Sequence, residues 1–290
     1  HRIAKISRMC EDMCEHWTKK RARPIPEIPE KAVWSEFSEL EDYERALENP
    51  RYLPVAYNAE NASIYCIDLS DTYCYMITGL ARSGKKNYMK IMIQSVMKRT
   101  GEIYIFDSDA KHMRVFEEKD GIQYAVDERG IFECFSKVIP EFKKRSQIRQ
   151  EMRDEDAEEI EIFERMCEET PIYFFISDLE WFINLIYNAE LDMRGFLENI
   201  LEKGRLLNIY FIGVIGLENI PTVDYQRIYE LFAGYKTGIH FGGNAAENHI
   251  YNFDAIPYKE QNMLLKPGIG LISSRLNGEV QQIIVPLARR

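Results

Sequence analysis

The chain has 290 residues and a formal net charge of −10, from 37 Lys and Arg against 47 Asp and Glu. A composition that is 46% hydrophobic and 29% charged is that of a globular protein, which excludes a disordered, collagen-like or low-complexity chain. The acidic balance argues against a surface that binds nucleic acid or anionic lipid throughout, and no run approaches the roughly 18 consecutive apolar residues of a membrane span.

An amphipathic helix is predicted at the start of the chain, followed by an extended linker. Apolar residues recur at helical spacing from Ile3 to Trp17, as in the buried stripe of a helix. Prolines within residues 24–30 prevent the helix from continuing. The expected organisation is therefore a helix and Pro-rich linker over residues 1–34 and one main domain over residues 35–290.

The six cysteines are too sparse for a disulfide scaffold and indicate a reduced, intracellular protein. Cys10, Cys14 and His16 could begin a zinc site, but no second pair of ligands follows at zinc spacing. We therefore expect no metal at this helix.

Three helical stretches are predicted in the main domain. They are a short acidic helix over residues 35–48, a one-sided helix over 85–98 and a long stretch over 130–169. Within the last, residues 151–169 hold ten acids against two arginines. This charge pattern indicates either a solvated face or a docking surface for a basic partner.

Short apolar runs alternate with these helical patterns, which is typical of a mostly parallel sheet flanked by helices. The runs predicted to be strands are residues 63–69, 73–78, 102–106, 171–177 and 208–215. The tail, with apolar runs over 270–274 and 280–285 around Asn277 and Gly278, predicts a closing hairpin. The sequence thus predicts an α/β fold with helices on a mostly parallel central sheet.

The segment from Gly79 to Lys85 joins a predicted strand to a predicted helix and has the glycine and lysine spacing of a phosphate-binding P-loop. Glycines let backbone N–H groups wrap phosphates, the helix N-terminus adds its positive end, and the lysine ammonium reaches the outer phosphates. The predicted nucleotide-binding residues are Gly79, Arg82, Ser83, Gly84, Lys85, Lys86 and Asn87.

Lys86 departs from this pattern, because the residue after the P-loop lysine is ordinarily a Ser or Thr whose hydroxyl coordinates Mg²⁺. An ammonium can neutralise phosphate charge but has no lone pair for a metal. Asn87 offers an amide oxygen, but one residue further along a helix turns it about 100° away. We therefore expect ATP to bind weakly or not at all, with a compromised magnesium seat and no bound metal.

Asp178 ends a predicted apolar strand, where a P-loop enzyme places the acid that holds the metal's water shell. The next residue, ordinarily the catalytic Glu, is Leu179, and Glu180 follows one step later. On an extended backbone Glu180 would return to the side of Asp178 without reaching the position of residue 179. Asp178 and Glu180 are candidate catalytic residues, and the alternative for Asp178 is the cap of the following helix.

The P-loop segment and several other stretches resemble a known family, the FtsK/SpoIIIE group of P-loop ATPases with a RecA/FtsK-like fold. Within it, they resemble the last ATPase module of the EssC/EccC coupling proteins of type VII secretion. The resemblance covers most of residues 20–287. It is carried, besides the P-loop, by residues 53–57, 66–70, 204–212 and 267–272.

Three departures from active relatives point to a degenerate module with little or no ATP hydrolysis. Lys86 replaces the Ser or Thr, Leu179 replaces the catalytic Glu, and residues 214–216 replace the Ala-Thr-Gln that ends the sensor strand. Arg205 matches the family's Gly-Arg pair, and a surface arginine is the alternative reading of it.

The resemblance implies a soluble module of a membrane-anchored motor on the cytoplasmic side of the bacterial cell membrane. Its implied partners are the preceding ATPase modules of the same chain and secreted type VII substrates. The implied assembly is a hexamer or other ring in the full-length protein and a monomer for a fragment. Trp181, Phe182 and Tyr187 are candidates for a pocket that receives a substrate tag, or are core residues.

Two other functions share the P-loop. An active FtsK-like DNA translocase would need a basic channel and an intact metal seat, so the acidic chain and Lys86 argue against nucleic acid as a partner. A small-molecule kinase or a GTPase would need acceptor or base-recognition motifs, and none is visible.

Overall fold

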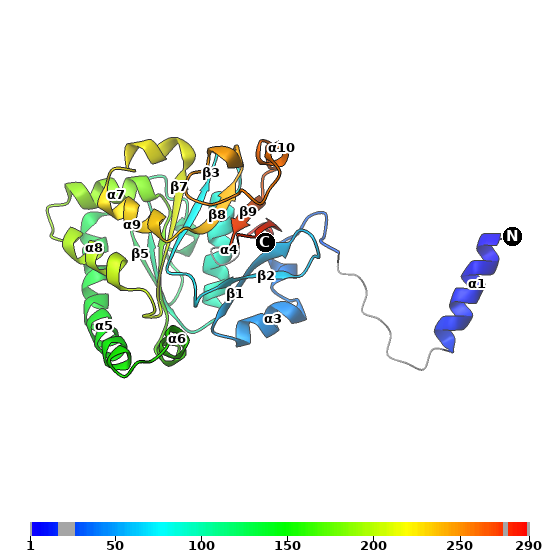
Figure 1. The fold of residues 1–290 in the computed structure, drawn as a ribbon, viewed down its shortest axis with the longest axis horizontal. Coiled ribbons are helices and arrows are strands. Elements are labelled where there is room, and N and C mark those ends of the chain that lie inside the picture. Colours follow the sequence, from blue (N-terminus) through cyan, green and yellow to red (C-terminus); the bar gives the residue numbers. More distant parts are fainter. Residues whose placement is uncertain (1, 17–26, 275–277, 289–290) are drawn as a thin grey trace.

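The computed structural model describes residues 2–16, 27–274 and 278–288. In this part of the chain a ten-stranded sheet runs in the order β2-β1-β10-β9-β8-β3-β7-β6-β4-β5. The strands from β8 to β5 in this order are parallel to one another, and β2, β1, β10 and β9 form an antiparallel edge (Figure 1). This mixed sheet agrees with the predicted α/β fold.

The predicted strands are present, with their ends shifted by a few residues at most. The ten strands are β1 (Tyr52–Asn58), β2 (Ile64–Asp68), β3 (Cys74–Gly79), β4 (Glu102–Phe106), β5 (Ile122–Ala125), β6 (Ile172–Ile176), β7 (Ile209–Gly216), β8 (Thr237–Phe241), β9 (Ile269–Ser273) and β10 (Val280–Ile284). The predicted hairpin is confirmed, because β9 and β10 pair antiparallel. The apolar runs did not predict β1, β5 and β8, although residues 53–57 of β1 carry part of the family resemblance.

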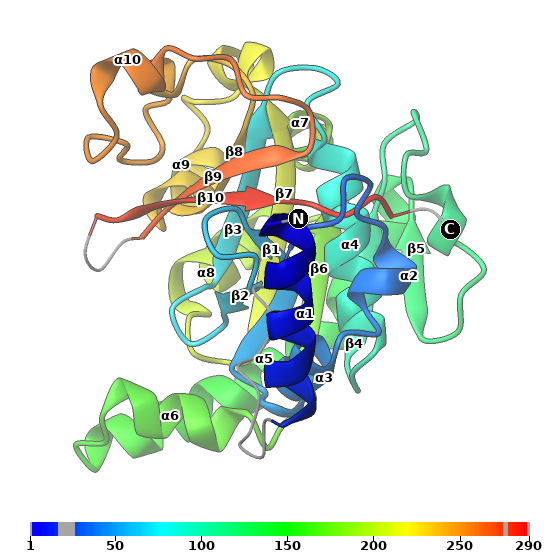
Figure 2. The same ribbon diagram turned by 90° about the vertical axis from the view of Figure 1, so that its right-hand side faces the viewer.

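Helices cover both faces of the parallel part of the sheet. They are α4 (Lys85–Met97), α5 (Glu128–Asp154), α6 (Glu159–Met166), α7 (Leu179–Asn188), α8 (Arg194–Lys203) and α9 (Arg227–Gly234). The other α-helices described between residues 27 and 288 are α2 (Trp34–Phe37), α3 (Glu41–Glu48) and α10 (Tyr258–Gln261). Figure 2 shows α4 on one side of the sheet and α8 and α9 on the other. None of the helices in the described chain combines the length and the hydropathy needed to cross a bilayer.

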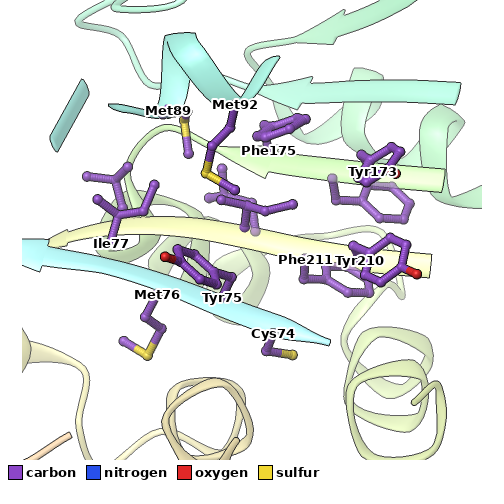
Figure 3. Packing of buried hydrophobic residues seen from close by; sticks show 14 of the residues in the cluster. Cys74, Tyr75, Met76, Ile77, Met89, Met92, Tyr173, Phe175, Tyr210 and Phe211 are labelled. Atoms are coloured by element: carbon purple, nitrogen blue, oxygen red, sulfur yellow. The ribbon is translucent and has the colours of Figure 1, made fainter. Parts of the chain in front are cut away.

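The core lies on both faces of the central strands, which explains why these strands read as continuous apolar runs. Along β3, Tyr75 and Ile77 point to the same side as Met89 of α4, whereas Met76 points to the opposite side (Figure 3). Aromatic rings continue the core from strand to strand. Phe174 of β6 stacks on Phe211 of β7 with 4.7 Å between ring centroids.

Two predicted helices are each divided in two. The acidic helix over 35–48 is interrupted because Leu40 is extended, which separates α2 from α3. The stretch over 130–169 breaks between α5 and α6, where Asp156 has a left-handed φ of 60°. Polarity and periodicity continue through both breaks, so only the backbone reveals them.

The first helix, α1 (Arg2–Glu15), forms as predicted, but its apolar stripe is not buried. Ile6, Met9 and Met13 are 59%, 61% and 63% exposed, since α1 stands clear of the sheet (Figure 1). The basic end of the predicted helix and its first two prolines lie outside the described residues.

Candidate nucleotide phosphate site

The predicted phosphate loop follows β3 at the carboxyl ends of the parallel strands, the edge where open α/β sheets bind ligands. Its first residue, Gly79, is paired with Gly216 of β7 on one side and with Phe241 of β8 on the other. The loop therefore begins between two strands that fix its position.

Both glycines of the loop are required by its backbone. Gly79 has a φ of +143°, and a Cβ there would lie 1.7 Å from the carbonyl oxygen of Phe241. Gly84 has a φ of +114°, and its Cβ would lie 3.1 Å from the nitrogen of Gly268. These are positions that only glycine occupies without strain. The loop is also tied from outside, because the N–H of Gly268 donates to the Ser83 carbonyl at 2.9 Å.

Lys85 is the first residue of α4 and its ammonium lies inside the turn of the loop. The Nζ atom donates to the carbonyl oxygen of Gly79 at 2.7 Å and also to that of Leu80. Burial lowers the pKa of Lys85, and the carboxylate of Glu218 opposes part of this effect. A cation is thus held at the N-terminus of a helix, an arrangement suited to an anion.

A cavity of about 490 Å³ opens over the loop. Its walls are residues 81–87, His112, Asp178, Val214, Gly216, Glu218 and Asn219. The structure therefore brings six of the seven predicted phosphate-site residues together with Asp178, while Gly79 forms the base of the loop. Glu180 does not line this cavity.

Lys86 is half-buried in the cavity wall and lies in a field of mixed charge. Burial lowers its pKa to about 8, Asp178 and Asp107 partly oppose this shift, and Lys85 adds to it. A lysine with this pKa remains charged at neutral pH. It can attract a phosphate, but it supplies no oxygen to a metal ion.

The amide of Asn87 has partners away from the loop. Its Nδ2 donates to the Pro286 carbonyl at 2.8 Å, and its Oδ1 accepts from the N–H of Ala288 at 2.9 Å. This side chain therefore joins α4 to the end of the chain. Its polar atoms already have backbone partners there.

Asp178 is the N-cap of α7, since its Oδ1 accepts from the N–H of Trp181 at 3.1 Å. The helix-cap alternative is therefore present in the structure, although Asp178 also lines the cavity. Glu180 accepts a hydrogen bond from the Thr222 hydroxyl at 2.8 Å. Because α7 begins at Leu179, the extended backbone assumed for Glu180 is not present, and Glu180 lies outside the cavity wall that Asp178 lines.

The position that ordinarily supplies a magnesium ligand is occupied by Lys86, and the aliphatic hydroxyls of the strand and loop before it are those of Thr78 and Ser83. The hydroxyl of Ser83 donates to the Leu80 carbonyl at 2.8 Å, and that of Thr78 donates to the Ile239 carbonyl at 3.2 Å. Leu179, at the position of the usual catalytic Glu, is fully buried. In the part of the chain that the structure describes, no three His, Cys, Asp or Glu side chains gather as a metal site.

Two acidic residues at the site were not predicted, Asp107 and Glu218. Asp107 is fully buried and accepts from the N–H of Met113 and the Tyr124 hydroxyl, both at 2.7 Å. Its position directly after a predicted strand was the available signal. Glu218 follows β7, and its closeness to the loop depends on the pairing of β7 with β3.

Of the three aromatic candidates for a tag pocket, Trp181 and Tyr187 are partly buried and pack against the core. Phe182 is fully buried and stacks on Phe106 with 5.6 Å between centroids, so it is a core residue. Tyr187 is partly covered by the Arg194 guanidinium, 4.1 Å from its ring centroid. Arg205 makes a two-pronged ion pair with Glu159 of α6, with both N–O distances 2.8 Å.

The chain resembles known secretion proteins, although no family model matches it. It is 22% identical over 266 residues to the ESX secretion system protein YukB of Bacillus subtilis (strain 168), covering 91% of this chain and 16% of YukB. The solved cytoplasmic domain of EssC has a TM-score of 0.75 at 16% identity, covering 99% of this chain and 52% of that one. EssC (ATPases 2 and 3) from Geobacillus thermodenitrificans has a TM-score of 0.72 at 16% identity, covering 99% and 50%.

The chain thus spans about a sixth of YukB and half of the matched EssC structures. The similarity extends over nearly all of this chain, so it concerns the whole fold rather than the P-loop alone. The predicted resemblance is confirmed: this chain has a P-loop ATPase fold and is similar to the EssC/EccC-type ATPase modules of the FtsK/SpoIIIE group.

Proposed function

We propose that this chain is an ATPase-fold module of a type VII secretion protein that binds a nucleotide without efficient magnesium-dependent hydrolysis. The observation that supports this most directly is Lys86, whose side chain lines the cavity where a Ser or Thr hydroxyl would be needed. The likeness to YukB and EssC supports the secretion context.

The phosphates would be held by the loop and by two lysines. The backbone from Gly79 to Gly84, the start of α4 and the Lys85 ammonium supply positive ends and donors. Lys86 adds a second ammonium in the same wall. Together they can offset phosphate charge without a divalent ion.

Hydrolysis lacks its ordinary groups at the same site. Leu179 has no polar atom, and Glu180 is engaged by Thr222 outside the cavity wall. An attacking water would therefore have no well-placed general base among the residues predicted for that role. We propose that bound nucleotide stabilises one arrangement of this module and its neighbours, with a coupling of ~1–3 kcal/mol.

The proposed setting is the cytoplasmic side of the bacterial membrane, with other ATPase modules of the same chain as neighbours and secreted proteins as substrates. The supporting fact is that the matched EssC structure is described as a cytoplasmic domain and is about twice as long as the matched region. A ring of several copies is part of this proposal.

Nucleotide binding and turnover should be measured separately, by calorimetry and by phosphate release, with Mg²⁺ or with EDTA. We expect binding in both buffers and negligible turnover in either. Lys85→Met should abolish binding, whereas the matched control Lys90→Met, on the same helix but outside this cavity, should not. Vigorous magnesium-dependent turnover would contradict the proposal, and its stimulation by duplex DNA would favour the translocase.

A further inference from the structure

Glu218 places a carboxylate of the chain itself in the phosphate cavity. It belongs to the 3₁₀ turn Leu217–Thr222, which follows β7 directly. A Cβ added at Gly216 would lie 2.6 Å from Oε1 and 2.9 Å from Oε2 of Glu218. The carboxylate therefore folds back over the backbone of Gly216, which has no side chain to prevent it.

This position is next to the start of the phosphate loop. Gly216 is the strand partner of Gly79, and the Lys85 ammonium donates to the carbonyl oxygen of Gly79. The Glu218 carboxylate therefore lies next to Gly216, and the Lys85 ammonium lies next to its strand partner Gly79. Glu218 favours the charged form of Lys85, which agrees with this arrangement. No direct Lys85–Glu218 ion pair is formed between these two described residues, and the ammonium instead donates to the carbonyl oxygens of Gly79 and Leu80.

The charge of the cavity wall limits how much negative charge it can accept. Its cations are Arg82, Lys85 and Lys86, and its anions are Asp178 and Glu218, a difference of only one positive charge. A triphosphate carries more negative charge than a diphosphate. In a P-loop ATPase magnesium offsets that charge and is held by the hydroxyl of the residue after the P-loop lysine, but here that residue is Lys86.

We infer that Glu218 is an internal anion that competes with the outermost phosphate of a triphosphate, so that this cavity binds nucleoside diphosphates more tightly than triphosphates. The inference rests on the proposed function, because it concerns the same phosphate site. It adds the class of ligand and the residue that selects it. Glu218 acts by repelling added charge, and the loop itself holds the phosphates that both ligands share.

The test is calorimetric binding of ADP and of ATP in EDTA to the wild-type protein, Glu218→Gln and Glu180→Gln. The wild type should prefer ADP by about tenfold, an effect of the size expected for one nearby charge in a partly buried site. Glu218→Gln should gain about tenfold in ATP affinity and change little toward ADP. Glu180→Gln is the matched control, since Glu180 lies outside the cavity wall and a Gln can still accept from Thr222.

A second variant separates charge from shape. Glu218→Asp keeps the carboxylate and should keep a preference for ADP, while thermal melts show that each variant is folded. If Glu218→Gln leaves the ratio of ATP affinity to ADP affinity unchanged, or lowers the affinity for ATP, this inference is overturned and the proposed function is not. If no variant binds either nucleotide, the proposed function fails and the inference fails with it.

Discussion

In the proposed function, residue 86 decides whether the charge of a bound phosphate is offset by a metal ion or by an ammonium. Lys86 is the neighbour of Lys85 in sequence, and both line one cavity with Asp178. Burial is the main cause of the lowered pKa of both lysines, and Lys85 adds a smaller part of the shift at Lys86. A bound anion offsets the cost of burying these two cations, so their burial favours phosphate binding.

Replacing Lys86 by Thr should restore a metal ligand without restoring nucleotide hydrolysis. We expect nucleotide binding by Lys86→Thr to become dependent on Mg²⁺, since a hydroxyl replaces the second ammonium. Turnover should stay within about twofold of background, because Leu179 and the engaged Glu180 are unchanged. Phosphate release and calorimetry measure the two effects. Efficient hydrolysis by this single variant would show that the departures at residues 179 and 214–216 do not prevent hydrolysis.

The pKa of Lys86, lowered by burial to about 8, predicts a pH dependence of binding. The ammonium is mostly charged at pH 7 and mostly neutral at pH 9, so nucleotide affinity should fall about tenfold over this range. In Lys86→Met the affinity should change little between pH 7 and pH 9. This result would assign the pH dependence to Lys86 rather than to the nearby Asp107, Asp178 or Lys85. Unfolding does not explain it, because a lysine with a lowered folded-state pKa contributes more stability as the pH rises.

At the scale of elements, the turn between α8 and β7 carries the Gly-Arg pair that the sequence singled out. A Cβ at Gly204 would lie 2.2 Å from Oη of Tyr73 and 2.5 Å from the Ile200 carbonyl oxygen. Tyr73, just before β3, donates its hydroxyl to that same carbonyl. The glycine thus lets the end of α8 approach the strand that leads to the phosphate loop, whereas Arg205 reaches outward to Glu159.

Gly204→Ala and Arg205→Ala should therefore differ in their effect on stability. Gly204→Ala must displace Tyr73 or the end of α8 and should cost ~2–4 kcal/mol. Arg205→Ala removes an ion pair whose two side chains are 34% and 57% exposed, and should cost under ~1 kcal/mol. Urea unfolding of both variants measures this order. Equal costs would contradict the predicted order, whereas a loss of nucleotide binding on Arg205→Ala alone would assign Arg205 a functional role.

The elements that the sequence predicted are those whose signal is local. Strands buried on both faces appear as apolar runs, and a loop that needs glycine shows glycine, as at Gly79 and Gly84. The strand β8 was missed because it contains Gly238 and the buried His240, which weaken the apolar run. Glu218 was missed because its place at the loop arises from pairing between strands far apart in sequence.

At the scale of the whole molecule, the residues that follow β10 connect the sheet to the phosphate loop by hydrogen bonds. The N–H of Val285 donates to the Gly268 carbonyl, and the N–H of Gly268 donates to the Ser83 carbonyl, both at 2.9 Å. Further on, Leu287 exchanges backbone hydrogen bonds of 2.9 Å with Ala32 and Trp34. The end of the described chain therefore joins the loop to the segment that precedes β1.

Asn87 is the side chain that fastens this closing segment to α4, and removing it tests the arrangement. Asn87→Ala leaves the Pro286 carbonyl and the Ala288 N–H without their amide partner. We expect a loss of ~1–2 kcal/mol in unfolding free energy and faster amide exchange at Leu287. The control Gln94→Ala removes one longer bond to Ala288, of 3.4 Å, and should cost under ~0.5 kcal/mol. Weaker nucleotide binding should accompany the faster exchange, because the loosened segment follows Val285, which bonds to Gly268, and Gly268 in turn supports Ser83. Loss of binding with unchanged exchange would mean instead that the Asn87 amide contacts the nucleotide itself.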